Sequence, residues 1–171
     1  GLFIEKLSAL TGVKIVRFAD LSQAMEQRIE YFHASGCRIS DHGPVEIHYQ
    51  PATAQQIEHV FAKKCAGETL TSTEHTALIS AIFVMLAGHY KKRQWAMQIH
   101  FGAIRSNNSL MKEKIGINTG FDSIADQCHL AQGLNGLLDA MARNNALPKT
   151  ILYNLNPIYN DIVATTIANF Q

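Results

Sequence analysis

The 171-residue sequence has only three cysteines, and they are not paired in the sequence. Cys37, Cys65 and Cys128 lie far apart. An odd number of cysteines without a paired spacing argues against a disulfide framework and against a zinc knuckle. Each cysteine has apolar neighbours, so we expect reduced, buried and unreactive thiols. This use of cysteine predicts a cytoplasmic protein.

Long apolar runs and a dominant charge are also missing. The longest apolar stretch, Ala77 to Ala87, is interrupted by Ser80 and is shorter than the roughly 20 residues that cross a membrane. We find no signal-peptide pattern. The net charge of +1 does not favour nucleic acid or an acidic membrane as a partner. Charged residues make up 17 %, which indicates either a polar uncharged surface or a surface covered by further protein.

The motifs of several common enzyme classes are absent as well. The eight histidines include no pair spaced four apart around a glutamate, as zinc peptidases require. The sequence has neither a phosphate-binding glycine loop nor a nucleophile elbow. These absences exclude the classes that such motifs define, and function has to be sought in the fold.

Apolar residues at helical spacing occupy much of the chain. Residues 20–36 form one such segment, which Asp20 can cap and Gly36 can end in a left-handed conformation. Thr53 with Gln56, and Thr71 with Glu74, have the spacing of capping boxes. We therefore predict a pair of helices within residues 51–94, and further helices over residues 123–144 and 160–170.

Three strands are predicted between these helices, over residues 36–43, 95–102 and 150–155. Strands that alternate with helices imply an α/β fold with a parallel sheet. Residues 95–102 are apolar on both faces, which predicts a strand covered on both sides. Two architectures remain open at this point: a small doubly wound sheet, and part of an eight-stranded barrel whose full form takes about 250 residues.

Polar residues at the carboxyl ends of these strands are the candidate functional groups, because parallel α/β folds place their sites there. Asp41 and His42 end the first strand, but adjacent strand residues point to opposite faces, so at most one of them enters a site. His100 in the second strand shares a face with Gln98, and Gly102 allows close approach to the backbone. His100 is either a catalytic or metal-binding imidazole or a hydrogen-bonded core residue.

A second group of candidates follows the strand. Arg105, with its neighbours Asn107 and Asn108, has the donors of a carboxylate or phosphate clamp, or it is a solvated loop arginine. Asp122 either contributes to the same binding site or caps the helix predicted to begin at Ser123.

Four segments in order resemble the uronate isomerase (glucuronate isomerase) family. The most specific is Met97-Gln-Ile-His-Phe-Gly-Ala-Ile-Arg-Ser-Asn-Asn108, which is similar to the signature strand and loop of that family. The other three are Gly36-Cys-Arg-Ile-Ser-Asp-His-Gly43, Thr119-Gly-Phe-Asp-Ser-Ile-Ala-Asp126 and Leu147-Pro-Lys-Thr-Ile-Leu-Tyr-Asn-Leu-Asn-Pro157. The resemblance extends over nearly the whole chain.

The resemblance implies an aldose–ketose isomerase that interconverts D-glucuronate and D-fructuronate, and D-galacturonate and D-tagaturonate. It implies a distorted (β/α)8 barrel of the amidohydrolase superfamily, in which residues 1–171 form a single segment with the fourth to sixth strands. Residues 51–94 are then a helical insertion between two barrel strands. His100 and Asp41 correspond to catalytic residues, His100 also to a metal ligand, and Arg105, Asn107, Asn108 and Asp122 to substrate-binding residues. The parent protein would hold a divalent metal such as zinc.

Parts of the family pattern are absent from this sequence. They are the His-x-His metal pair of the first strand, the aspartate of the eighth strand and the tryptophan region of the seventh. Ser106 and Ala125 also replace the family's usual asparagine and glycine. We therefore expect an internal fragment that is inactive alone. Its partner would be a uronic acid, with neither nucleic acid nor membrane, and a homo-oligomer stays open. The alternative is a non-catalytic binding or scaffold module derived from the same barrel.

Overall fold

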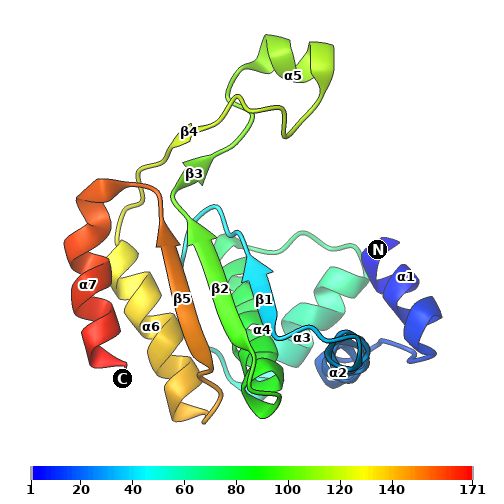
Figure 1. The fold of residues 1–171 in the computed structure, drawn as a ribbon. Coiled ribbons are helices and arrows are strands. Elements are labelled where there is room, and N and C mark those ends of the chain that lie inside the picture. Colours follow the sequence, from blue (N-terminus) through cyan, green and yellow to red (C-terminus); the bar gives the residue numbers. More distant parts are fainter. Residues whose placement is uncertain (1, 171) are drawn as a thin grey trace.

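The computed structural model describes residues 2–170 and has an α/β fold built on a parallel three-stranded sheet (Figure 1). The strand order is β1-β2-β5. The strands are β1 (Ile39–His42), β2 (Ala96–Phe101), β3 (Ala103–Ile104), β4 (Ser123–Ile124) and β5 (Lys149–Asn154). The helices are α1 (Leu2–Thr11), α2 (Phe18–Ala34), α3 (Ala54–Cys65), α4 (Ser72–Lys92), α5 (Ser109–Ile115), α6 (Leu130–Arg143), the 3-10 helix η1 (Pro157–Tyr159) and α7 (Asn160–Asn169).

The three parallel strands follow each other across the sheet in the order of the chain. The registers are parallel, with Asp41 opposite Gln98 and His100 opposite Tyr153. Right-handed crossovers that all run in one direction place their helices on the same face of the sheet. A doubly wound sheet reverses its strand order and carries helices on both faces. The described strands show no such reversal, as in a barrel or within one half of a doubly wound sheet.

Within residues 2–170, one face of the sheet is therefore covered by helices and the other is not. Met97, Ile99 and Phe101 point to the covered face and are at most 2 % exposed. They pack in one core with residues of α4 and α6, among them Leu86 and Leu134. The prediction that residues 95–102 are covered on both sides is not met within residues 2–170, because α4 and α6, which connect the three strands, both lie behind the sheet (Figure 1).

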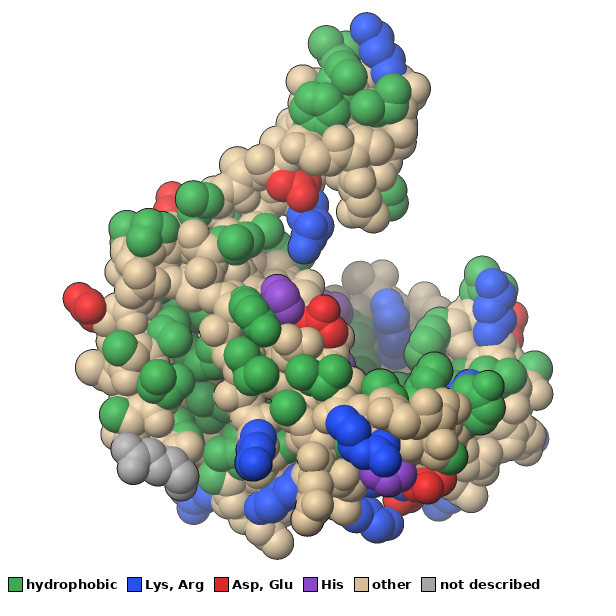
Figure 2. Space-filling view, in the orientation of Figure 1, with side chains coloured by type: hydrophobic (Ala, Val, Ile, Leu, Met, Phe, Trp, Pro, Cys, Tyr) green, Lys and Arg blue, Asp and Glu red, His purple; other side chains and the backbone are tan. Residues whose placement is uncertain are grey.

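The opposite face carries large apolar side chains in the open. Ile39, Ile151 and Tyr153 are 43 %, 41 % and 41 % exposed. Figure 2 views this face and shows apolar side chains gathered over the strands, with histidine and acidic side chains beside one another. We call it the uncovered face.

Local capping signals determine where the helices of the 51–94 segment begin. Thr53 accepts a hydrogen bond from the Gln56 backbone N–H at 3.2 Å, and Gln56 Oε1 accepts one from the Thr53 N–H at 2.8 Å. Thr71 and Glu74 repeat both bonds at the start of α4. Both capping boxes are confirmed. Asp20, by contrast, lies inside α2 and accepts a hydrogen bond from the Arg17 N–H, so it is not the N-cap residue itself.

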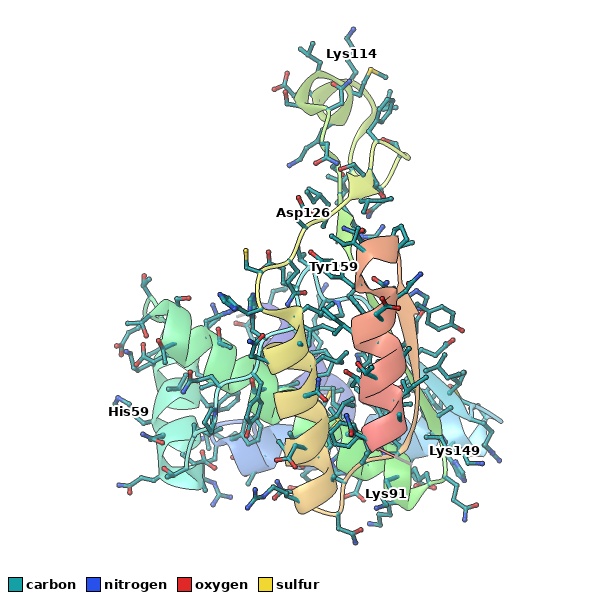
Figure 3. All side chains as sticks on the ribbon, turned by 90° about the vertical axis from the view of Figure 1, so that its left-hand side faces the viewer. His59, Lys91, Lys114, Asp126, Lys149 and Tyr159 are labelled. Carbon is teal, nitrogen blue, oxygen red and sulfur yellow. The ribbon has the colours of Figure 1, made fainter. Side chains whose placement is uncertain are left out.

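The segment between β2 and α6 differs most from the sequence prediction. The prediction of a helix over residues 123–144 was wrong at its start, because Ser123 and Ile124 form β4, which pairs antiparallel with β3. Helix α6 begins only at Leu130, after His129 with its positive φ of 60°. Strand β3, helix α5 and strand β4 form a projection over residues 103–124, which we call the arm. Lys114 lies at the tip of the arm, at the opposite end of the molecule from Lys91 and Lys149 (Figure 3).

The cysteines were expected to be buried, and this was wrong. Cys65 and Cys128 are exposed, and Cys37 is half-buried. Cys65 is the last residue of α3 and Cys128 lies in the loop before α6, where few side chains cover them. The three thiols are free, as predicted. In residues 2–170 we also find no helix that is long and apolar enough to span a bilayer.

Candidate functional site

Asp41 and His100 meet on the uncovered face, near the carboxyl ends of β1 and β2. His100 Nε2 lies 3.0 Å from Asp41 Oδ1. Asp41 is in register with Gln98. His100 lies two residues after Gln98 on the same face, so its side chain reaches back diagonally to the Asp41 carboxylate. The side chain of His100 is 42 % exposed and that of Asp41 is 64 % exposed, which leaves both accessible to a small molecule. The structure thus brings together two residues that the sequence analysis selected separately.

Tyr153 and Gln98 complete this group of side chains. The imidazole of His100 stacks on the Tyr153 ring, with centroids 4.2 Å apart and planes 7° from parallel. The Tyr153 hydroxyl donates a hydrogen bond of 2.7 Å to Gln98 Oε1. Tyr153 was not among the candidate residues predicted from the sequence. The only signal for it was the alternation of β5, which places Tyr153 on the same side as Ile151.

His42 lies on the covered face, as expected for a residue adjacent to Asp41 in a strand. Its Nε2 is 3.2 Å from the Tyr90 hydroxyl of α4. Burial lowers the pKa of His42, and the nearby Asp41 carboxylate raises it in part. A buried imidazole that contacts a buried tyrosine is a packing element of the core, so Asp41 is the member of the pair available for chemistry.

Arg105 and Asp122 form an ion pair at the base of the arm. Arg105 Nη1 lies 3.2 Å from Asp122 Oδ2, and the other carboxylate oxygen accepts a 2.8 Å hydrogen bond from the Ser106 N–H. Ser106 has a positive φ of 55°, and the Asp122 carboxylate holds this turn. No helix begins next to Asp122, so the predicted helix-cap role was wrong. The Arg105 side chain is 57 % exposed, and its other N–H donors make no hydrogen bond within residues 2–170.

The two asparagines beside Arg105 make hydrogen bonds within the arm. Asn107 Nδ2 donates to the Ile104 carbonyl at 2.8 Å and to Ser123 Oγ at 3.1 Å. Asn108 Oδ1 accepts from the Met111 N–H at 3.1 Å and caps α5. These contacts show how the asparagines hold the arm in shape. Their substrate-binding role stays a prediction.

Gly102 connects the two groups of candidate residues. It lies between β2, which carries His100, and β3, which leads to Arg105. Its φ of +87° is a conformation that glycine adopts without strain. Its carbonyl accepts a 2.9 Å hydrogen bond from the Ala125 N–H. Among the described residues, no hydrogen bond or ion pair joins the Asp41–His100 pair to the Arg105–Asp122 pair.

The side chains at this position do not form a complete metal site. Catalytic zinc sites usually take three protein ligands. Within residues 2–170, no group of three or more His, Cys, Asp or Glu side chains is placed to hold a metal ion. His100 and Asp41 supply two groups, and they contact each other. The metal-binding role of His100 therefore stays a prediction.

Comparison with known proteins places this arrangement in a family. A family model described as glucuronate isomerase matches residues 2–171. The chain belongs to this family. Two curated uronate isomerases are similar to this member of the glucuronate isomerase family over nearly its whole length. The protein from Staphylococcus haemolyticus is 49 % identical over 168 residues, which cover 98 % of this chain. The one from Salmonella paratyphi B is 45 % identical over 170 residues, or 99 % of this chain.

Solved structures of the glucuronate isomerase family have the same fold. A uronate isomerase from Thermotoga maritima superposes with a TM-score of 0.88 at 24 % identity and covers 99 % of this chain. A glucuronate isomerase from Caulobacter crescentus gives a TM-score of 0.75 at 19 % identity over 91 % of this chain. These two likenesses establish the α/β fold.

The match covers only part of each relative. The chain spans 36 % of the length of both curated proteins. It spans 37 % and 32 % of the two solved chains. The family is thus established for a segment that corresponds to about a third of the length of these relatives. This agrees with the expectation of an internal fragment.

Proposed function

We propose that these residues are part of a uronate isomerase that interconverts D-glucuronate and D-fructuronate, and D-galacturonate and D-tagaturonate. The observation that carries the proposal is the Asp41–His100 pair at the carboxyl ends of parallel strands in a chain of the glucuronate isomerase family. The names of the curated relatives favour this function over a binding or scaffold module. We also propose a cytoplasmic location, which the free cysteines support.

The proposed architecture is a (β/α)8 barrel in which β1, β2 and β5 are the fourth to sixth strands. Residues 1–171 are then one segment of the barrel domain, and residues 51–94 are a helical insertion between two strands. The strand order without reversal supports this, since a barrel keeps its helices on the outside. The uncovered face becomes the barrel interior, where the exposed Ile39 and Ile151 would be buried by the other strands.

The proposed reaction moves a hydrogen from C2 of the aldose to C1 through an enediol-like state. A base removes the C2 hydrogen as a proton and a proton is delivered to C1, while the proton of the C2 hydroxyl passes to the C1 oxygen, so that the formula is unchanged. His100 contacts these oxygens, and the Asp41 carboxylate stabilises charge on the imidazole. The unused donors of Arg105 bind the uronate carboxylate. We assign the base to residues outside this segment.

The proposal is tested with the complete isomerase and with the 171-residue chain, each incubated with D-glucuronate and D-galacturonate while ketose formation is measured. We expect turnover by the complete protein and none by the 171-residue chain, because the proposed base lies outside that chain. Folded complete protein that converts neither uronate would refute the proposed function. If it bound uronate without converting it, the binding-module alternative would replace it. Turnover by the 171-residue chain would contradict the assignment of the base.

A further inference from the structure

Arg105 and Asp122 face each other across the two-stranded base of the arm. Strands β3 and β4 pair antiparallel, with Ile104 opposite Ser123. One further step of this register places Arg105 opposite Asp122, and Arg105 Nη1 lies 3.2 Å from Asp122 Oδ2. The arm rises from the carboxyl end of β2 (Figure 1). The pair therefore lies at the edge of the sheet where parallel α/β proteins place their sites.

The Asp122 carboxylate is itself held in place. Its Oδ1 accepts a 2.8 Å hydrogen bond from the Ser106 N–H. The Asn107 N–H bonds to the Phe121 carbonyl at 2.7 Å and continues the pairing of the two chain segments. The Asp122 side chain is 31 % exposed, whereas that of Arg105 is 57 % exposed. The carboxylate is thus the anchored member of the pair, and it can restrain the longer and more exposed arginine.

The contact leaves one edge of the guanidinium group free. In arginine, Nε and Nη2 point their N–H groups in parallel and can bind both oxygens of one carboxylate, whereas Nη1 lies on the side of Cδ. Asp122 contacts Nη1, and neither Nε nor Nη2 makes a hydrogen bond within residues 2–170. A ligand that binds a flexible side chain has to immobilise it. Asp122 restrains Arg105 and leaves the parallel pair of donors available.

We infer that Asp122 is a positioning residue for Arg105, which holds the guanidinium so that Nε and Nη2 bind the uronate carboxylate together. The inference rests on the proposed function for its substrate. Asp122 does not touch the substrate in this arrangement, since two carboxylates repel each other. Its role thus differs from the direct substrate binding that the family resemblance implies, because it acts through Arg105.

Two other roles for Asp122 make different predictions. A cross-strand ion pair can simply stabilise the arm, and its loss would then have an effect whether or not Arg105 is present. The negative charge of Asp122 can also weaken the attraction for an anionic substrate. Its removal would then lower KM, and this effect would fade as salt screens the charges.

The experiment is a double-mutant cycle in the complete isomerase, with the parent, D122N, R105A and the double variant. It measures kcat and KM for D-glucuronate at an ionic strength of about 0.15 M, where exposed charges are largely screened beyond a few ångströms. Asparagine has one acceptor oxygen, and we expect it to keep the shorter bond to the Ser106 N–H and to release Arg105.

D122N should raise KM roughly 2- to 10-fold, because substrate binding then has to immobilise the Arg105 side chain. The value of kcat should not change, since the carboxylate contact is the same in the ground state and in the transition state. In the R105A background, D122N should leave KM unchanged, because a residue that acts only through Arg105 has nothing left to position.

S123A is the matched structural control. Ser123 Oγ accepts a 3.1 Å hydrogen bond from Asn107 Nδ2 in the same base of the arm, and it does not contact Arg105. S123A should keep the parental KM and kcat. If D122N does not fold, D122S replaces it in the cycle, since serine also lacks the charge.

The outcomes separate this inference from the proposed function. With turnover in the parent, an unchanged or lowered KM in folded D122N would overturn the inference and leave the isomerase function standing. An equal rise in S123A, the same rise from D122N without Arg105, or an unchanged KM in R105A would do so too. Absence of turnover in the parent would refute the isomerase function, and calorimetric Kd values for D-glucuronate would then carry the same cycle. Absence of binding as well would overturn the inference.

Discussion

The two faces of the parallel sheet are built by the same strands and have opposite properties. On the covered face, Ile99 is fully buried and packs in a core between the strands and α4 and α6. On the uncovered face, the next residue, His100, is 42 % exposed and contacts Asp41 and Tyr153. Strand alternation separates the two neighbours completely. Fold stability and candidate chemistry therefore lie one residue apart, and substitutions should separate them.

The largest expected effect is the loss of catalysis in His100→Asn of the complete isomerase. General acid–base groups contribute roughly 100- to 10,000-fold to rates, and we expect kcat to fall in this range. The free energy of unfolding should change by no more than about 1.5 kcal/mol, the upper worth of a stacked aromatic pair. Ketose formation and urea denaturation measure the two quantities. If the His100→Asn protein lost several kcal/mol of stability, the prediction that the uncovered face serves chemistry and not stability would be wrong.

Ile99→Ala should have the reverse effect. Truncation of a fully buried isoleucine costs about 2–5 kcal/mol, because it removes buried apolar surface and leaves a cavity. The folded enzyme should keep its kcat, since Ile99 points away from the site. Chemical denaturation measures the loss of stability, and ketose formation measures kcat on the same protein. A large fall in kcat at unchanged KM would mean that the covered face also shapes the site.

Arg105→Ala extends the comparison to the arm. Loss of a charge-assisted contact with a carboxylate is worth about 1.5–3 kcal/mol, so we expect KM for D-glucuronate to rise roughly 10- to 100-fold. Arg143→Ala is the matched control, because Arg143 is also an exposed arginine near an aspartate, Asp139, but on α6. If both variants gave the same KM as the parent, Arg105 would be a solvated loop residue.

The smallest expected effect concerns Glu74, which lies away from both faces. The hydrogen bond from Lys63 Nζ, and next the one from the Thr71 N–H, lower the pKa of Glu74 from 4.5 to about 2. A folded-state pKa below the unfolded one adds stability above pH 4.5, and this stability is lost as the pH falls toward 2. The melting temperatures of the parent and of Glu74→Gln should therefore differ most near pH 7 and converge near pH 2.

The control for this comparison is Gln56, the equivalent capping position of α3. It carries no charge, so Gln56→Ala should lower the melting temperature by the same amount at every pH in that range. A difference between the parent and Glu74→Gln that stayed constant down to pH 2 would show that Glu74 is not titrating as the structure indicates. Neither variant should alter kcat.

Local patterns in the sequence were enough to predict the helices of the 51–94 segment and to select Asp41 and His100 as separate candidates at strand ends. The capping boxes use residues three apart, and strand ends follow from apolar runs and their alternation. Tyr153 could not be found this way, because its position opposite His100 depends on the register of two strands that are distant in the sequence. Local spacing does not encode that register.

The arm and the loop after it were misjudged for the same reason. Ser123 and Ile124 have a spacing compatible with a helix, but they pair with β3 across the arm. Gln127 is buried and its side chain bonds both the N–H and the carbonyl of Ile47, 80 residues earlier in the chain. Gly133 permits the close passage of Ile47, since a Cβ there would lie 2.1 Å from the Ile47 carbonyl oxygen. Such long-range contacts override local helix propensity.

The α3–α4 pair also has a consequence for the order of folding. Its two capping boxes and the 2.6 Å contact between Lys63 and Glu74 join residues that are near in sequence, whereas β1 must find β2 across the whole 51–94 segment. Loop closure makes contacts distant in sequence slow to form. We therefore expect amides of α3 and α4 to gain protection from hydrogen exchange before those of the sheet. The segment that interrupts the strands would then shorten the effective distance between them during folding.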